Sequence, residues 1–89
     1  MTNTVKRKGY TEIFDERKIY ASVYAACLSL RMKDEEAELI AHMVSHETVE
    51  EFKKEHEVSA HTIHRFVAKS LEKYNSDAAY LYDTHKDIS

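Results

Sequence analysis

The chain has 89 residues, with no proline, one glycine and 43% hydrophobic residues. This length fits one small domain, and so few helix breakers favour long helices over a β-sandwich or a β-barrel. The single cysteine, Cys27, excludes an internal disulfide framework and a cysteine-based zinc site, and it fits a reducing compartment.

Charge is unevenly distributed along the chain. Residues 1–33 carry seven Lys or Arg and three Asp or Glu, whereas residues 34–89 carry six and thirteen, which leaves a net charge of −3. The acidic part argues against a nucleic-acid groove along its length, while the basic part suits a small multivalent anion. Because we find no secretory signal, and the longest apolar run is the six residues from Val23 to Leu28, we expect a cytoplasmic protein without a membrane span.

The first predicted element is a β-hairpin over residues 4–13. Thr4-Val5 and the run from Tyr10 to Ile13 are rich in residues that favour strands. Between them lie the basic triplet from Lys6 to Lys8 and the only glycine, Gly9. Glycine adopts positive φ without a Cβ clash, so this order of residues predicts a tight reversal of the chain.

A helix is expected next, over about residues 16–30. Asp15 is a favourable N-cap, and Phe14 before it is well spaced to pack on Ile19 as a hydrophobic staple. The apolar positions recur at helical spacing and are Ile19, Val23, Ala26, Cys27 and Leu30. Cys27 lies in the middle of this stripe, so we expect its thiol to be buried. A basic hairpin beside a helix N-terminus gathers cations and backbone donors, which favours the binding of an anion.

Three further helices are expected, over about residues 34–55, 59–74 and 77–88. Acidic residues open the first of them, Ser59 is an N-cap candidate for the second, and residues 75–77 interrupt the pattern before the third. Each helix has a wide apolar face, as a helical bundle requires. The sequence therefore predicts a single, mainly α domain of the α+β class, a four-helix bundle capped by a small N-terminal β-hairpin.

Lys6, Arg7 and Lys18 are the strongest candidates for ligand binding. A triphosphate carries several negative charges, and two or three cations beside helix-end amides suit it. The alternative is that these residues form a solvated basic turn without a ligand.

Neighbouring residues suggest how the rest of such a ligand is held. Glu12 is suited either to accept a hydrogen bond from a ribose or adenine group or to hold a lysine in place. Val5, Ile13 and Phe14 are candidates to line a flat apolar slot for adenine. The alternative, packing of the hairpin on the bundle, is compatible with this role.

The same stretch, TVKRKGYTEIFDERKI, resembles the opening signature of the ATP-cone. This is the nucleotide-sensing domain of many ribonucleotide reductases and of the repressor of their genes. The matching positions are Lys6, Arg7, Gly9, Glu12, Phe14, Asp15, Lys18 and Ile19. The chain departs from the signature at Lys8, where the family usually has Asp, and at Thr4, where it usually has Val or Ile.

The resemblance extends over almost the whole chain. The segment VSAHTIH is similar to the start of the family's third helix and makes His64 the ligand-facing candidate, with Ser59 one step from a hydroxyl position of the family. Ala79-Tyr80 matches the start of the fourth helix, and Lys86 is the nearest candidate for a phosphate-contacting lysine. The resemblance thus implies a nucleotide site made of Val5, Lys6, Arg7, Glu12, Phe14, Asp15, Lys18, Ile19, Ser59, His64 and Lys86.

An allosteric function follows from this resemblance. It implies that the chain binds ATP or dATP, with Mg²⁺ on the phosphates, and thereby controls a ribonucleotide reductase or another protein partner, or its own association. The chain is either a domain excised from a larger protein or a stand-alone cone, and we expect no direct contact with nucleic acid or membrane. It has no GxxxxGK[ST] loop and no recognisable nucleophile, so we expect binding without catalysis.

Two other functions remain open at this stage. A helical interaction module could keep the same fold without binding nucleotide. A metal sensor could use the pairs His42 and His46 or His61 and His64, because each pair is spaced to share one face of a helix.

Overall fold

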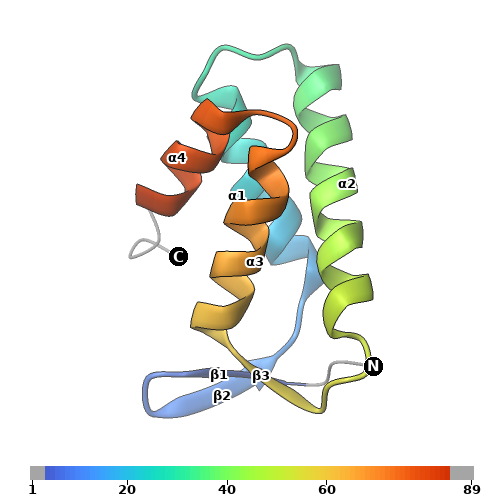
Figure 1. Cartoon of the computed structure of the whole chain (residues 1–89), viewed down its shortest axis with the longest axis vertical. Coiled ribbons are helices and arrows are strands. Elements are labelled where there is room, and N and C mark those ends of the chain that lie inside the picture. The colour runs from blue at the N-terminus through green and yellow to red at the C-terminus, as the bar shows by residue number, and fades with distance from the viewer. Residues whose placement is uncertain (1–3, 85–89) are drawn as a thin grey trace.

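Four helices and a small sheet make up the computed structural model, which describes residues 4–84 (Figure 1). The elements are β1 (Thr4–Arg7), β2 (Tyr10–Ile13), α1 (Glu16–Leu28), α2 (Asp34–Phe52), β3 (Glu57–Ser59), α3 (Ala60–Glu72) and α4 (Ser76–Thr84). Helices α1 and α3 each pack on both α2 and α4, so the four form a ring, with the sheet across one end. The prediction of a mainly α fold with a small β component is confirmed.

The hairpin has a two-residue loop formed by Lys8 and Gly9. Strands β1 and β2 pair antiparallel, from Thr4 opposite Ile13 to Arg7 opposite Tyr10. Gly9 has a φ of 76°, in the left-handed region that favours glycine. Lys8 does not adopt positive φ, so a lysine at this position requires no strained backbone.

Strand β3 is an element that the sequence pattern does not predict. It pairs parallel to β1, with Val5 opposite Val58, and the Thr4 backbone N–H donates to the His56 carbonyl at 3.2 Å. Three residues are too few to show the alternation that identifies a strand. The expectation of a hairpin alone is therefore corrected: the cap is a three-stranded sheet in the order β2-β1-β3.

Two predicted N-caps have the expected hydrogen bonds. The Asp15 carboxylate accepts from the Arg17 backbone N–H at 3.0 Å, and the Ser59 hydroxyl accepts from that of Thr62 at 3.0 Å. Helix α1 ends at Leu28, earlier than expected, because the chain then turns tightly to Arg31, which has a φ of 61°. The expected C-terminal end of the fourth helix lies outside the described residues.

The core is built from the apolar stripes of the helices and from the inner face of the sheet. The apolar stripes of α1, α2 and α3 supply its buried centre. The buried residues on these stripes are Ile19, Val23, Ala26, Cys27, Ala37, Ile40, Val44, Thr48, Phe52, Ile63, Val67, Ser70 and Leu71. Val5 of β1 and Val58 of β3 join the same cluster and attach the sheet to the helices.

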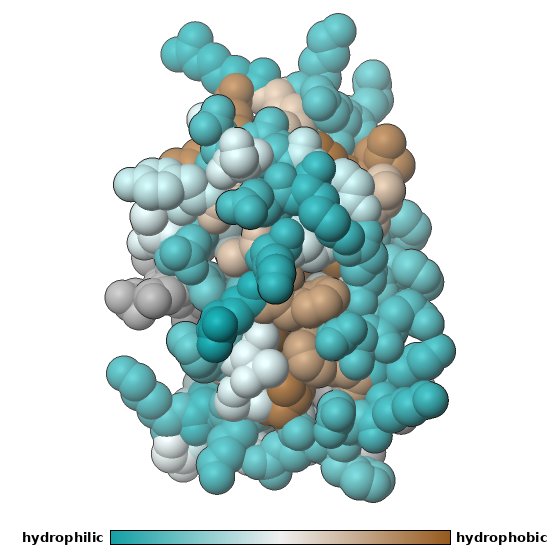
Figure 2. Space-filling view, in the orientation of Figure 1, coloured by the Kyte–Doolittle hydropathy of each residue, from teal (hydrophilic) through white to brown (hydrophobic). Residues whose placement is uncertain are grey.

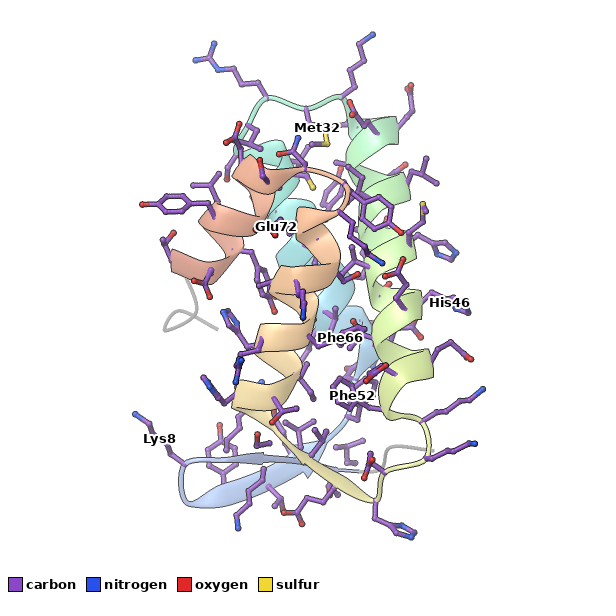
Figure 3. The ribbon with its side chains drawn as sticks, in the orientation of Figure 1. Lys8, Met32, His46, Phe52, Phe66 and Glu72 are labelled. Atoms are coloured by element: carbon purple, nitrogen blue, oxygen red, sulfur yellow. The ribbon has the colours of Figure 1, made fainter. Side chains whose placement is uncertain are left out.

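A polar contact that the sequence does not reveal joins α2 to α3. The Glu47 carboxylate accepts hydrogen bonds from Ser70 Oγ at 2.6 Å, from Lys73 Nζ at 2.8 Å and from the Tyr74 hydroxyl. Closer to the sheet, Phe52 at the end of α2 and Phe66 in the middle of α3 meet edge to face, with ring centroids 5.5 Å apart (Figure 3). Polar and aromatic contacts thus fix the α2–α3 pair along its length.

The surface is mostly hydrophilic on the face shown in Figure 2, where apolar residues form a narrow band between α3 and α2 and a few others lie near the end opposite the sheet. In the described part of the chain, every helix is too short or too polar to cross a membrane.

We expect Cys27 to resist alkylation in the folded protein. Burial raises the pKa of its thiol, and the nearby charge of Glu36 adds to the effect, so little reactive thiolate forms. The measurement is the rate of labelling by a thiol reagent with and without denaturant. Rapid labelling of the native protein would contradict a core position for Cys27.

We expect Glu47→Gln to lower the free energy of unfolding by about 2 kcal/mol at neutral pH, because charge-assisted hydrogen bonds to α3 are lost. Burial acts to raise the pKa of Glu47, but the hydrogen bonds from α3 outweigh it and lower the pKa to about 2 from an ordinary value of 4.5. The contribution of Glu47 to the free energy of unfolding is therefore fully present above about pH 4.5 and is lost as the pH falls toward 2.

The measurement is denaturant unfolding of the parent and the variant across this pH range. Glu51→Gln, a change at an exposed position of the same helix, is the matched control and should leave stability unchanged. Equal acid sensitivity of the parent and of Glu47→Gln would show that this contact is not the source of the pH dependence.

Candidate functional site

A cleft of about 1080 Å³ opens between the sheet and the adjacent ends of the helices. Its walls come from β1, β2, the start of α1, the start of α3 and Tyr82 of α4. Ten of the eleven candidate residues from the sequence line it, and they are Val5, Lys6, Arg7, Glu12, Phe14, Asp15, Lys18, Ile19, Ser59 and His64. The eleventh, Lys86, lies outside the described residues.

Glu12 links two of the predicted cations. Its carboxylate accepts from Arg7 Nε at 2.5 Å and from Lys18 Nζ at 3.5 Å. The hydrogen bond from Arg7 is the main cause of a lowered pKa at Glu12, so this group stays ionised at neutral pH. The network holds a strand cation and a helix cation beside one another on the wall of the cleft.

Strand alternation gives Arg7 and Lys6 different positions. In β1, Arg7 shares its face with Val5, which packs into the core, whereas Lys6 lies on the opposite face. Arg7 is accordingly half-buried and Lys6 is exposed, although both border the cleft. Lys8 extends outward from the tip of the hairpin (Figure 3). Arg7 is thus the cation most firmly fixed at the site.

Two helix N-termini meet the cleft. Asp15, the N-cap of α1, and Ser59, the N-cap of α3, both line it. Backbone N–H groups at a helix N-terminus point outward and attract anions. The Arg17 side chain donates hydrogen bonds to the Asp15 carboxylate at 3.1 Å and 3.2 Å. These bonds lower the pKa of Asp15.

An apolar patch covers part of the cleft wall. Val5, Ile19 and Ile63 are buried beneath it, and Phe14 is half-buried on its surface. Ile13, also expected here, borders the cleft but is 79% exposed because it lies on the opposite face of β2 from Glu12. The patch offers a flat aromatic ligand group a contact area beside the cations.

His64 meets a residue that the sequence analysis did not assign to the site. Its ring stacks on that of Tyr82, with centroids 4.7 Å apart and an interplanar angle of 16°, and its Nε2 lies 3.0 Å from Asp83 Oδ1. Burial raises the pKa of Tyr82 to about 12, while the charge of Arg7 acts in the opposite sense. The Tyr82 hydroxyl therefore stays protonated. In the sequence, Tyr82 lies on the apolar face of the last helix, so it looks like a core residue and its place on the cleft wall is not evident.

The histidine pairs that suggested a metal do not gather further ligands. His46 extends from the outer side of α2 (Figure 3), and His61 is exposed at the edge of the cleft. Within residues 4–84, no three His, Cys, Asp or Glu side chains are grouped as a metal ion would need.

Comparison with known proteins agrees with the signature in the N-terminal segment. The family model described as the ATP cone domain matches residues 2–86, nearly the whole chain. No curated protein and no solved structure matches the chain at a significant level. ATP-cones are nucleotide-binding regulatory domains, and a match of this extent shows that the chain belongs to the ATP-cone family.

Proposed function

We propose that the cleft binds ATP or dATP and that its occupancy regulates a protein partner. The observation that carries the proposal is the pairing of Arg7 and Lys18 through Glu12, beside two helix N-termini. Cations and helix-end amides in one cleft suit a chain of phosphates better than they suit a neutral ligand.

The phosphates would bind at the cationic end of the cleft. Arg7 offers a planar group that can donate two parallel hydrogen bonds to a phosphate, and Lys18 supplies a second charge from α1. Because Glu12 already neutralises part of this charge, the arriving phosphate exchanges one anionic partner for another and the cations need little rearrangement. Lys6 adds a weaker, more solvated attraction.

The nucleoside would occupy the apolar side of the cleft. Val5, Phe14 and Ile19 present apolar surface next to the cations, as a purine ring requires. Glu12 lies between the two regions and is suited to accept a hydrogen bond from the ribose once phosphate engages its cations. The cleft volume of about 1080 Å³ is just above the range of about 300–1000 Å³ typical of small-molecule sites, so it is large enough for a nucleoside triphosphate.

Mg²⁺ would enter with the nucleotide and not as a resident ion. Both carboxylates that line the cleft already bind protein donors, Glu12 to Arg7 and Lys18, and Asp15 to Arg17. Mg²⁺ readily keeps several water ligands and binds phosphate oxygens, so it needs no carboxylate cage here. Its role would be to reduce the charge of the phosphates.

Regulation of a partner is the function that membership of the family favours. The partner that the resemblance implies is a ribonucleotide reductase or the repressor of its genes, and association between cones is the alternative output. A cytoplasmic location is consistent with both, because that is where adenine nucleotides and the reductase meet.

We expect Arg7→Ala to weaken ATP binding by about ten- to a hundredfold, the usual value of a charge-assisted hydrogen bond. Lys6→Ala should weaken it less, because Lys6 lies on the opposite face of β1. Affinity should also fall as salt is added, because the site is partly exposed. The measurement is calorimetric titration of each variant with ATP, dATP and GTP at two salt concentrations.

Lys33→Ala is the matched control, since Lys33 is exposed and lies at the opposite end of the bundle. Circular dichroism checks that each variant is folded. If folded Arg7→Ala and Lys6→Ala bind ATP as the parent does, the cleft is not the nucleotide site. If the parent binds no nucleotide, the protein is an interaction module that shares only the fold.

We expect ATP to be bound without being hydrolysed. A phosphate-cradling loop needs several flexible glycines, and this chain has one. Asp15 is held in an ion pair with Arg17, and Glu12, once phosphate has taken over its cations, would be engaged by the ribose, which leaves neither well suited to act as a general base. Phosphate release is the measurement, and steady release that Arg7→Ala abolishes would contradict this expectation.

A further inference from the structure

Tyr10 lines the cleft with most of its surface open to solvent. The residue is 58% exposed, although it carries a large aromatic ring. Within residues 4–84, its hydroxyl makes no side-chain hydrogen bond and its ring meets no other ring. The ring and the hydroxyl of Tyr10 are therefore accessible to a ligand that enters the cleft.

The pairing of the hairpin strands sets the direction of the Tyr10 side chain. Residues two apart in a strand point to the same side, so Tyr10 shares its face with Glu12, whose carboxylate pairs with Arg7 and Lys18 on the cleft wall. Tyr10 is also directly opposite Arg7 in the register of β1 and β2. Opposite residues have Cβ atoms about 4.5–5.5 Å apart. Tyr10 thus leaves the sheet beside the cation that is most firmly fixed at the site.

Arg7 keeps its two terminal nitrogens available in this arrangement. Its Nε donates to Glu12, whereas neither Nη atom donates to a residue in the described part of the chain. A guanidinium with free N–H groups is well suited to hold a phosphate. Because Arg7 and Tyr10 both have long side chains and leave the same face side by side, a phosphate on the Nη atoms would lie close to the Tyr10 hydroxyl.

The inner face of the hairpin also sets the order in which the parts of a nucleotide are met. Phe14 lies just beyond the end of β2, Glu12 lies within the strand, and Tyr10 begins it at the turn. Alternate residues of a strand are about 7 Å apart along its length. With the nucleoside at Phe14 and the ribose at Glu12, as proposed above, the phosphates extend toward the turn. The terminal phosphate then comes nearest to Tyr10.

We propose that Tyr10 is a specificity-determining residue whose hydroxyl donates a hydrogen bond to the terminal phosphate of a nucleoside triphosphate. This inference rests on the nucleotide-binding function proposed above and names the part of the ligand that the hairpin turn recognises. A tyrosine hydroxyl can donate one hydrogen bond, and an ionised oxygen is a strong acceptor. A nucleoside diphosphate is shorter by one phosphate and leaves Tyr10 without this contact. Tyr10 thereby favours ATP over ADP.

The other residues near the turn are directed elsewhere. Lys8 extends outward from the tip of the hairpin (Figure 3), and Lys6 lies on the opposite face of β1, although both border the cleft. Gly9 has no side chain, and its φ of 76° makes the reversal that sets Tyr10 opposite Arg7. Tyr10 is therefore the side chain at the turn that shares a face with Arg7.

The test is calorimetric titration of the parent, Tyr10→Phe and Tyr10→Ala with ATP and with ADP, each in the presence of Mg²⁺. Tyr10→Phe removes only the hydroxyl and keeps an aromatic residue that favours strands. We expect it to weaken ATP binding by about tenfold, the lower end for a hydrogen bond to a charged group, and ADP binding by less than about twofold. Tyr10→Ala should change the preference for ATP over ADP at least as much.

Tyr80→Phe is the matched control and should leave both affinities unchanged, because Tyr80 is 69% exposed on α4 and is not part of the cleft wall. Circular dichroism checks that each variant is folded. Equal losses for ATP and ADP in Tyr10→Phe, or no loss for either, would overturn the inference. A loss in Tyr10→Ala alone would overturn it too, because the ring and not the hydroxyl would then contact the ligand.

The parent titrations separate a failure of this inference from a failure of the proposed function. If the parent binds ATP and Tyr10→Phe binds it equally well, the assignment of Tyr10 is wrong while the cleft remains a nucleotide site. If the parent binds neither ATP nor ADP, the proposed function fails, and recognition of the terminal phosphate fails with it.

Discussion

The central strand β1 is the constraint on which the rest of the site depends. It pairs with β2 on one side and with β3 on the other, and Val5 in its middle is buried in the helical core. The hairpin is therefore joined to the start of α3 through backbone hydrogen bonds as well as through side-chain packing. This attachment holds Arg7 opposite the N-termini of α1 and α3. A free hairpin would place its cations in solvent, where screening weakens them.

The ion pairs of Glu12 keep two cations close together in the cleft while giving each of them an anionic partner. Glu12 lies between Arg7 and Lys18 and keeps both near one point of the cleft. Their mutual repulsion is thereby reduced before a ligand arrives. In the proposed complex, phosphate would take over the cations, and Glu12 would become available to a ligand hydroxyl. Such preorganisation lowers the cost of ordering long side chains on binding.

Local patterns predict the helices and the hairpin well, because each depends on neighbouring residues. The stripe from Ile19 to Leu30, the caps Asp15 and Ser59, and the turn at Gly9 are all of this kind. Contacts between distant segments could not be found in this way. Strand β3 is too short to have a pattern, and Glu47 has the polarity of any exposed helix residue until α3 packs beside it. Ten candidate residues that line the cleft were named from residue chemistry and from the family resemblance, whereas the contacts of Tyr82 and Asp83 with His64 emerged only from the packing of α4 on α3.

The most direct test of this account is an amide-resolved NMR titration of the parent protein with ATP and Mg²⁺. We expect signals to shift in the hairpin from Lys6 to Glu12 and in the first turns of α1 and α3, which line the cleft. Signals of residues 29–33, at the opposite end of the bundle, should not move. Shifts centred on residues 29–33, or no shifts at saturating nucleotide, would contradict it.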